Sequence, residues 1–142
     1  MRRLLVIIAW MVLAVAFVLQ TPSDSAGQSK KEPMSESKTG TGFDGLAGRW
    51  LRPDGGYIIQ IQGIDSSGKM EAKYFNPRLI NVSKAQAKRE NGKIKVFVEL
   101  SDVGYPGSTY TLTYDPKEDV LRGIYYQAAM KQSFDVYFTR MK

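Results

Sequence analysis

From residue 46 to the last residue, short segments of alternating apolar and polar side chains are separated by tight turn signals, and none keeps a helical period. The turn signals include the run Pro53-Asp54-Gly55-Gly56 and the dipeptide Asn91-Gly92. Asn-Gly is the strongest short hairpin signal, because a type I′ turn needs a positive φ at both central residues. This punctuation predicts eight strands. They cover residues 46–51, 57–64, 69–76, 82–90, 93–101, 108–115, 120–127 and 133–140.

The predicted strands are joined by connections of hairpin length, so strands that are neighbours in sequence should pair antiparallel. Eight strands in a meander are the usual number for a closed up-and-down barrel, which leaves no sheet edge exposed. We therefore predict an all-β domain over residues 44–142 that forms an eight-stranded antiparallel barrel. Segment 82–90 offers only Ala85 and Ala87 to the interior. These small side chains would leave room inside the barrel or let it flatten there.

The composition excludes several kinds of chemistry. The chain has neither cysteine nor histidine, and its net charge is +6. Disulfides, thiolate nucleophiles, cysteine-based metal sites and histidine-dependent triads are therefore impossible. We also find no carboxylate pair, phosphate loop or nucleophile elbow. The sequence predicts a protein that is not an enzyme, with no catalytic residues, metal or cofactor.

The N-terminal part differs from the rest. Arg2 and Arg3 precede an apolar run over residues 4–19, which is short for a membrane span and typical of an export signal. We interpret residues 1–26 as a signal peptide or an uncleaved N-terminal anchor. Residues 27–43 are rich in serine, lysine and glycine and are predicted to be a disordered linker. Both readings place the domain outside the cytoplasm, secreted or periplasmic, with membrane contact only through an uncleaved segment.

A family resemblance rests on three features: Gly48-x-Trp50 in the first strand, the meander, and Arg140 at the end of the last strand. Together they resemble the calycin superfamily, which includes lipocalins, fatty-acid-binding proteins and avidins. In lipocalins an arginine from the end of the barrel packs over the motif tryptophan. The resemblance implies that Arg140 stacks on Trp50 and that the two close one end of the barrel, which makes both of them candidate ligand-binding residues. Gly48 would let a neighbouring group approach closely.

The opening of the domain, residues 46–74, also resembles the avidins in spacing, with Tyr74 at a position that matches their biotin site. Two further positions depart from that pattern, because Arg52 and Gly56 stand where avidins carry polar ligand-binding side chains. No second tryptophan remains once residues 1–26 are removed. The resemblance therefore does not extend to biotin binding.

Tyrosines recur on the faces that alternation assigns to the interior. Phenol side chains would give an interior pocket apolar walls and a few directed polar groups, and this combination is typical of small-molecule sites. The alternative is a packed core whose hydroxyls bond to backbone or water. A cavity of ~300 Å³ or more would favour a ligand. The inward tyrosines, which are candidate ligand-binding residues, are Tyr57, Tyr74, Tyr110, Tyr114 and Tyr125.

Residues 102–107 are predicted to form the longest loop between strands, carrying Tyr105 at a barrel rim. Loops at a barrel mouth often bear function, so Tyr105 is a candidate ligand-binding residue. The alternative is a rigid turn with Tyr105 packed on the rim. The segment Asn76-Pro77-Arg78 is placed on a neighbouring rim, facing that loop.

Two outer surfaces offer alternatives. Lysines at positions 73, 84, 88 and 95 lie on outward faces of consecutive strands and form either a solvated face or a surface for phosphate or anionic lipid. No aromatic platform accompanies them, so no nucleic-acid partner is expected. An apolar outer stripe is also predicted, from Phe75, Phe97, Ile124 and Tyr126.

Two functions follow from these patterns. The first is an exported binding module that holds a small apolar or amphipathic molecule inside the barrel. The second is an interaction module with a filled core, which would contact a protein partner through its outer face and the loop 102–107.

Overall fold

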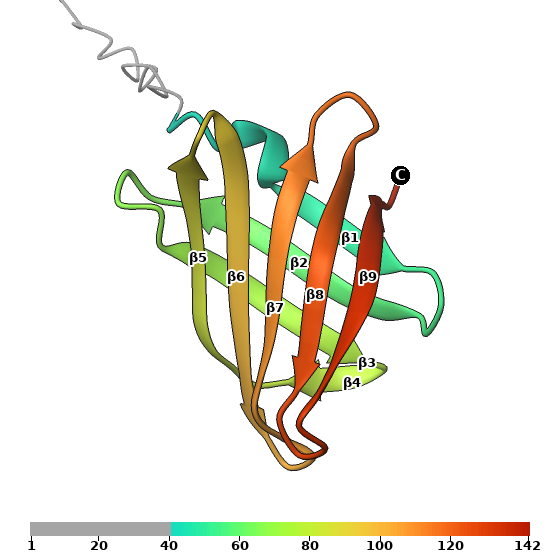
Figure 1. Cartoon of the computed structure of the whole chain (residues 1–142). Coiled ribbons are helices and arrows are strands. Elements are labelled where there is room, and N and C mark those ends of the chain that lie inside the picture. Colours follow the sequence, from blue (N-terminus) through green and yellow to red (C-terminus); the bar gives the residue numbers. More distant parts are fainter. Residues whose placement is uncertain (1–40) are drawn as a thin grey trace, which may run out of the picture. The chain divides into compact units, whose positions relative to one another are not determined.

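The structure, a computed structural model, describes residues 41–142 and shows nine strands in one antiparallel sheet (Figure 1). A single 3₁₀ turn, η1 (Asp44–Leu46), precedes them, and within residues 41–142 no helix is long and apolar enough to cross a membrane. The predicted signal segment 1–26 and residues 27–40 of the predicted linker lie outside the described residues. The strands are β1 (Gly48–Arg52), β2 (Tyr57–Ile64), β3 (Met70–Asn76), β4 (Arg78–Ile80), β5 (Val82–Glu90), β6 (Lys93–Asp102), β7 (Tyr105–Asp115), β8 (Val120–Gln127) and β9 (Gln132–Arg140).

The strand order is β4-β3-β2-β1-β9-β8-β7-β6-β5. Each pair of adjacent strands is also adjacent in sequence except β1 and β9, and the sequence neighbours β4 and β5 lie at the two ends of the order. Trp50 lies opposite Arg140 in that pairing, and Leu51 lies opposite Thr139. The last strand therefore lies beside the first, and the prediction of an all-β antiparallel barrel with joined ends is confirmed in its main feature. The barrel is nearly closed.

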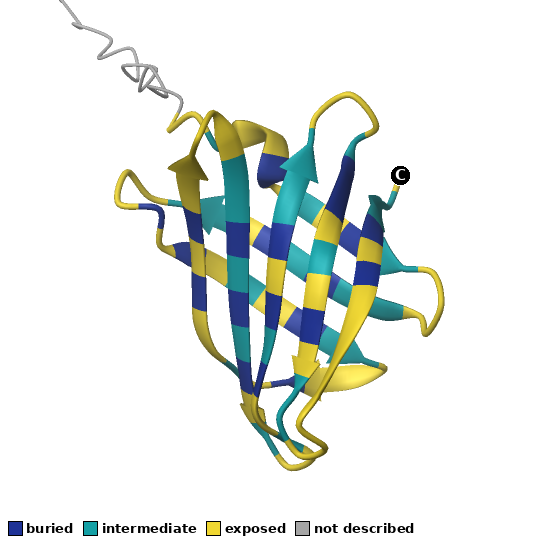
Figure 2. Ribbon diagram, in the orientation of Figure 1, coloured by how far each residue is buried: buried dark blue, intermediate teal, exposed yellow. Residues whose placement is uncertain are grey.

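The strands follow the alternation of the sequence. In β6, Val96, Val98 and Leu100 are fully buried, and the side chains between them lie nearer the solvent. Figure 2 shows the same banding of buried and exposed residues along β5 to β9. At the β5–β6 turn, Asn91 and Gly92 have φ angles of 50° and 73°. This positive pair confirms the predicted Asn-Gly hairpin.

The number of strands was predicted wrongly, because residues 78–80 form a ninth strand, β4. It pairs with the end of β3, with Ile80 opposite Tyr74 and Leu79 opposite Phe75. Pro77 alone separates β3 from β4, since proline ends a strand by lacking a backbone N–H. Three residues are too few to show an alternation, so β4 has no recognisable sequence signal. Leu46, predicted within the first strand, lies in η1 instead.

The predicted loop 102–107 is also corrected. β6 continues to Asp102 and β7 begins at Tyr105, so only Val103 and Gly104 lie between the two strands. The pairing register shifts between Leu100 and Ser101, opposite Gly107 with its φ of 78°. A β-bulge of this kind absorbs an extra residue within the ladder. The glycines and proline of this stretch therefore belong to a bulged hairpin rather than to a long loop.

β4 and β5, at the two ends of the strand order, leave a seam between β3 and β5. The seam is bridged near its end, where Lys69 lies opposite Gln86 and the Ala87 N–H donates to the Gly68 carbonyl at 2.7 Å. Beside this bridge, between β3 and β5, lies a hollow of about 530 Å³, whose lining includes Met70 and Ala85. The room expected beside Ala85 is therefore found at the surface, where the barrel is incompletely closed.

Gly68 should be necessary for the seam contact. Its φ is 85°, and an added Cβ would lie 2.1 Å from the Ala87 carbonyl oxygen. We expect Gly68→Ala to lower the free energy of unfolding by about 2 kcal/mol and to accelerate hydrogen exchange of the Ala87 amide. Gly92→Ala is the matched control, because its φ of 73° is similar but an added Cβ there has no heavy atom within 4 Å. That variant should lose only about 1 kcal/mol, and equal losses in the two variants would contradict the role of Gly68 at the seam.

Candidate functional site

One end of the barrel is closed by Trp50. The side chain is completely buried, and its Nε1–H donates to the Leu46 carbonyl at 2.9 Å. The Tyr114 ring meets the indole edge-on, with 5.8 Å between the ring centroids. A buried indole needs both an apolar surround and a partner for its N–H. The η1 turn supplies that partner, because it places the Leu46 carbonyl against the ring.

Arg140 covers the outer side of this plug. Its guanidinium carbon lies 4.2 Å from the Trp50 ring centroid, so the cation–π stacking implied by the family resemblance is confirmed. Nη1 donates to the Ala47 carbonyl at 2.7 Å, and Nη2 donates to the Gly45 carbonyl. An added Cβ at Gly48 would lie 2.7 Å from Arg140 Nη1, so glycine is what allows this close approach.

Asp119, in the β7–β8 turn, completes the closed end. It accepts from Arg140 Nε at 2.6 Å and Nη2 at 2.9 Å, and from the Tyr114 hydroxyl at 3.0 Å. The hydrogen bonds from Arg140 hold the pKa of this carboxyl below its usual range. Three of the candidate ligand residues, Trp50, Tyr114 and Arg140, therefore lie in this closed base.

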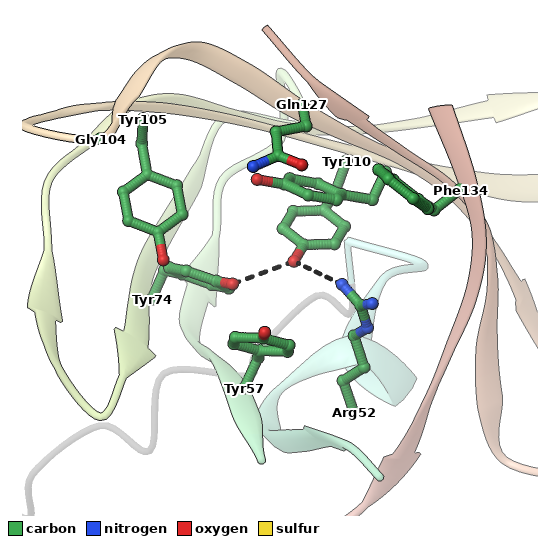
Figure 3. Close-up of a pocket in the computed structure, with 9 residues that line it drawn as sticks. Arg52, Tyr57, Tyr74, Gly104, Tyr105, Tyr110, Gln127 and Phe134 are labelled. Atoms are coloured by element: carbon green, nitrogen blue, oxygen red, sulfur yellow. Dashed lines mark hydrogen bonds between the residues drawn. The ribbon is translucent and has the colours of Figure 1, made fainter. Parts of the chain in front are cut away.

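The other five candidates meet at the opposite end of the barrel, around a pocket of about 420 Å³ (Figure 3). They come from four strands, and the volume exceeds the ~300 Å³ that favours a ligand over a filled core. The five are Tyr57 on β2, Tyr74 on β3, Tyr105 and Tyr110 on β7, and Tyr125 on β8.

Two buried tyrosines form the floor of the pocket. The hydroxyls of Tyr74 and Tyr110 lie 3.0 Å apart in a hydrogen bond, and their ring centroids are separated by 5.6 Å. Burial raises the pKa of Tyr110 to about 12 and that of Tyr74 further still. Both phenols are therefore protonated at neutral pH.

Arg52, at the end of β1, is a pocket residue that was not among the predicted sites. Its Nη1 donates to the Tyr110 hydroxyl at 3.4 Å, as Figure 3 shows. The guanidinium carbon lies 4.8 Å from the Tyr57 ring centroid and 5.6 Å from that of Tyr125. The alternation of side chains along the strand could have identified Arg52 as an interior residue, because residues 50 and 52 of one strand share a face and Trp50 was already placed inside.

Asp54 holds Arg52 from the β1–β2 turn. Arg52 Nε and Nη2 donate to the two Asp54 oxygens at 2.7 and 2.8 Å, a paired geometry that fixes the plane of the guanidinium. The hydrogen bonds from Arg52 lower the pKa of Asp54. The Arg52 side chain is 12% exposed and that of Asp54 is 57% exposed. The carboxylate thus lies on the solvent side of the arginine, and it does not line the pocket.

The rim of the pocket is built from the β6–β7 hairpin and its neighbours. Asn76 Nδ2 donates to the Tyr105 hydroxyl, and Arg78 forms an ion pair with Asp102 at 3.4 Å. The expectation that residues 76–78 face this hairpin is therefore confirmed. Phe134 completes the rim, and its ring lies 6.3 Å from that of Tyr125 in a stacked arrangement.

Sequence reasoning also missed Phe134, Gln127 and Gly104, which line the pocket as well. Phe134 is 40% exposed because it lies at the open end of the barrel.

The two outer surfaces are less distinctive. On the lysine face, Lys88 pairs with Glu90 at 3.4 Å and Lys95 donates to Thr113 Oγ1 at 2.8 Å. Of the predicted apolar stripe, Ile124 and Tyr126 are exposed, whereas Phe75 and Phe97 are half-buried. Tyr137 on β9, which is 45% exposed, adds to the exposed part of the stripe.

Fold and site together define a class: a nearly closed antiparallel β-barrel, sealed at one end by a tryptophan and hollowed at the other by tyrosines and one arginine. Within residues 41–142, no cluster of acidic side chains is arranged to hold a metal ion. Comparison with protein families, curated proteins and solved structures returned no match.

Proposed function

We propose that the chain is an exported, non-enzymatic binding module of calycin-like type, which holds a small amphipathic molecule in the tyrosine-lined pocket. The observation that supports this proposal most strongly is the pocket of about 420 Å³ that gathers five tyrosines from four strands. A core built only for stability would fill such a space with apolar side chains at crystal-like density. The proposal of export is supported by the sequence pattern of residues 1–26, which is either a cleaved signal peptide or an uncleaved segment that contacts the membrane.

The walls of the pocket suit a flat apolar body. Tyr57 is nearly parallel to Tyr74, with ring centroids 6.4 Å apart, and Tyr125 stacks on Tyr110 at 4.6 Å. Aromatic side chains supply large contact areas at low conformational cost, and their hydroxyls orient a polar group of the ligand. The closed base leaves the rim near Phe134 and Tyr105 as the entrance.

A matched pair of substitutions tests the pocket. Phe134→Ala removes a ring that lines it, and Tyr137→Ala removes a similarly exposed ring of the same strand that does not. We expect the neutral dye N-phenyl-1-naphthylamine to bind the wild-type protein with one-to-one stoichiometry. Phe134→Ala should weaken this binding by about 5- to 30-fold, because it loses ~1–2 kcal/mol of apolar contact, and Tyr137→Ala should leave it unchanged. Fluorescence titration measures both affinities.

Native mass spectrometry of the full chain, purified from its own host, provides the second measurement. A co-purified small molecule that is lost from Phe134→Ala supports the proposal. The proposed function would be contradicted if the dye does not bind and the mass spectrum shows only the protein. It would also be contradicted if Phe134→Ala and Tyr137→Ala change the dye affinity equally.

A second function is favoured by the exposed apolar residues on β8 and β9. Ile124, Tyr126 and Tyr137 lie on the outer face and are 37–45% exposed. As an interaction module, the protein would use this face to contact a protein partner. In the same mass spectra, a bound partner chain that is lost from Tyr137→Ala and retained in Phe134→Ala would favour this alternative.

A further inference from the structure

The floor of the pocket carries more hydrogen-bond donors than the protein itself uses. The hydroxyls of Tyr74 and Tyr110 share one hydrogen bond but have two protons between them. Arg52 donates to Tyr110 and therefore accepts neither proton. Whichever tyrosine donates within the pair, the other keeps a proton, and among residues 41–142 no further acceptor is bonded to either hydroxyl.

Arg52 adds donors of its own. A guanidinium has five N–H groups, of which Asp54 takes two and Tyr110 takes one. Two N–H groups remain, one on Nη1 and one on Nη2. Nη1 is the nitrogen that points toward the Tyr110 hydroxyl (Figure 3), so its second N–H lies next to the floor donors.

Acceptors are scarce around the same space. No aspartate or glutamate lines the pocket, and the Gln127 amide is the only side-chain carbonyl in its lining. At the rim, the Tyr105 oxygen already accepts from Asn76, so its own proton is directed elsewhere. The pocket therefore complements a ligand that supplies acceptors.

The charge of the site selects among acceptor groups. Arg52 is the only cationic residue in the lining, and Asp54 already balances part of its charge from the solvent side. A phosphate dianion would enter an apolar, aromatic pocket with less than one compensating charge, which is costly. A carboxylate carries a single charge, is planar, and accepts from an arginine edge and a hydroxyl together.

We propose that the ligand carries a planar carboxylate, which accepts hydrogen bonds from Arg52 Nη1 and from the free hydroxyl proton of the Tyr74–Tyr110 pair. This inference rests on the proposed function, since it names the chemistry of the polar end of the molecule that the pocket binds. The apolar part of the ligand lies against Tyr57, Tyr125 and Phe134, toward the rim.

Three naphthalene probes test the proposal on the full chain by competition with N-phenyl-1-naphthylamine. They share one ring system and differ in the polar group: 2-naphthoate, 2-naphthamide and 2-naphthyl phosphate. We expect 2-naphthoate to bind the wild-type protein at least tenfold more tightly than either of the others. Arg52→Gln should remove this preference, because it should weaken the binding of 2-naphthoate more than that of 2-naphthamide. Arg122→Gln is the control, because Arg122 is an exposed arginine on the outer face of β8.

The outcomes separate the two proposals. If all three probes bind equally, or 2-naphthyl phosphate binds best, the carboxylate inference is overturned and the binding function stands. If neither the dye nor any probe binds the wild-type protein, the binding function itself fails. Should Arg52→Gln not fold, the wild-type ratio of 2-naphthoate to 2-naphthamide still decides, because it requires no substitution.

Discussion

Replacing Trp50 by alanine should lower the free energy of unfolding by about 3–5 kcal/mol. The indole is fully buried, so its removal leaves a cavity at the closed end of the barrel. It also orphans the Leu46 carbonyl and removes the ring on which Arg140 stacks. Because small domains are stable by only 5–15 kcal/mol, this loss is a large part of the total.

Urea unfolding followed by far-ultraviolet circular dichroism measures this change without relying on tryptophan fluorescence. Trp50→Phe should lose less, because a phenyl ring still fills much of the space. Tyr137→Ala, which removes an exposed ring, should change stability by no more than about 0.5 kcal/mol. An unchanged unfolding midpoint in Trp50→Ala would refute the role of the indole as the plug of the barrel.

Arg140→Ala should lower the free energy of unfolding by about 3 kcal/mol. The substitution removes the cation over Trp50 and leaves the carbonyls of Gly45 and Ala47 without their donor. It also breaks the paired hydrogen bonds to Asp119. The side chain is 28% exposed, so water replaces some of these contacts and the loss stays below that of a fully buried ion pair.

Arg122→Ala is the matched control for Arg140→Ala. Arg122 also pairs with an acidic residue of the β7–β8 turn, Glu118, but both side chains are more than half exposed. Exposed pairs contribute ~0–1 kcal/mol, so little change is expected. Equal losses in the two arginine variants would show that Arg140 acts only as a surface charge.

Lowering the pH should weaken the contact between Arg140 and Asp119. Arg140 lowers the pKa of Asp119 in the folded protein, so the ionised carboxylate stabilises the fold above the ordinary aspartate pKa. This contribution is lost as the pH falls through the lowered pKa. Urea midpoints measured from pH 5 to pH 2 should therefore fall less steeply in Asp119→Asn than in the wild-type protein. The carboxylate is 42% exposed, so the difference should be small.

Most of the fold was predictable from local sequence patterns. The period-2 alternation identified the eight longer strands and their inward faces, and Asn91-Gly92 identified its hairpin, because both signals lie within a few neighbouring residues. The alternation did not identify β4, because that strand is too short. It also did not show that β6 and β7 extend into residues 102–107, where a bulge lies among glycines and a proline. In the second case Gly104 and Gly107 marked a tight turn and a bulge, and the same residue types also occur in loops.

The candidate site was predictable in kind but not in position. Alternation placed Tyr110 and Tyr114 on the same face of one strand, yet Tyr110 lies at the floor of the pocket and Tyr114 in the closed base. Four residues of a strand span about 13 Å, which is enough to separate the two ends of a small barrel. Which end is hollow depends on the side chains contributed by every other strand, and the sequence of one strand does not contain that information.

The sequence by itself determined that this chain forms antiparallel strands, which side of each strand faces inward, and that an indole and an arginine stand where they can close an end. Each of these follows from backbone geometry that repeats every two residues. Only the tertiary structure decided that Arg52 joins the Tyr74–Tyr110 pair, that β3 and β5 leave a seam, and that the tyrosine-lined end is open. Those features depend on the register in which distant strands meet, because register decides which inward side chains share a layer of the barrel.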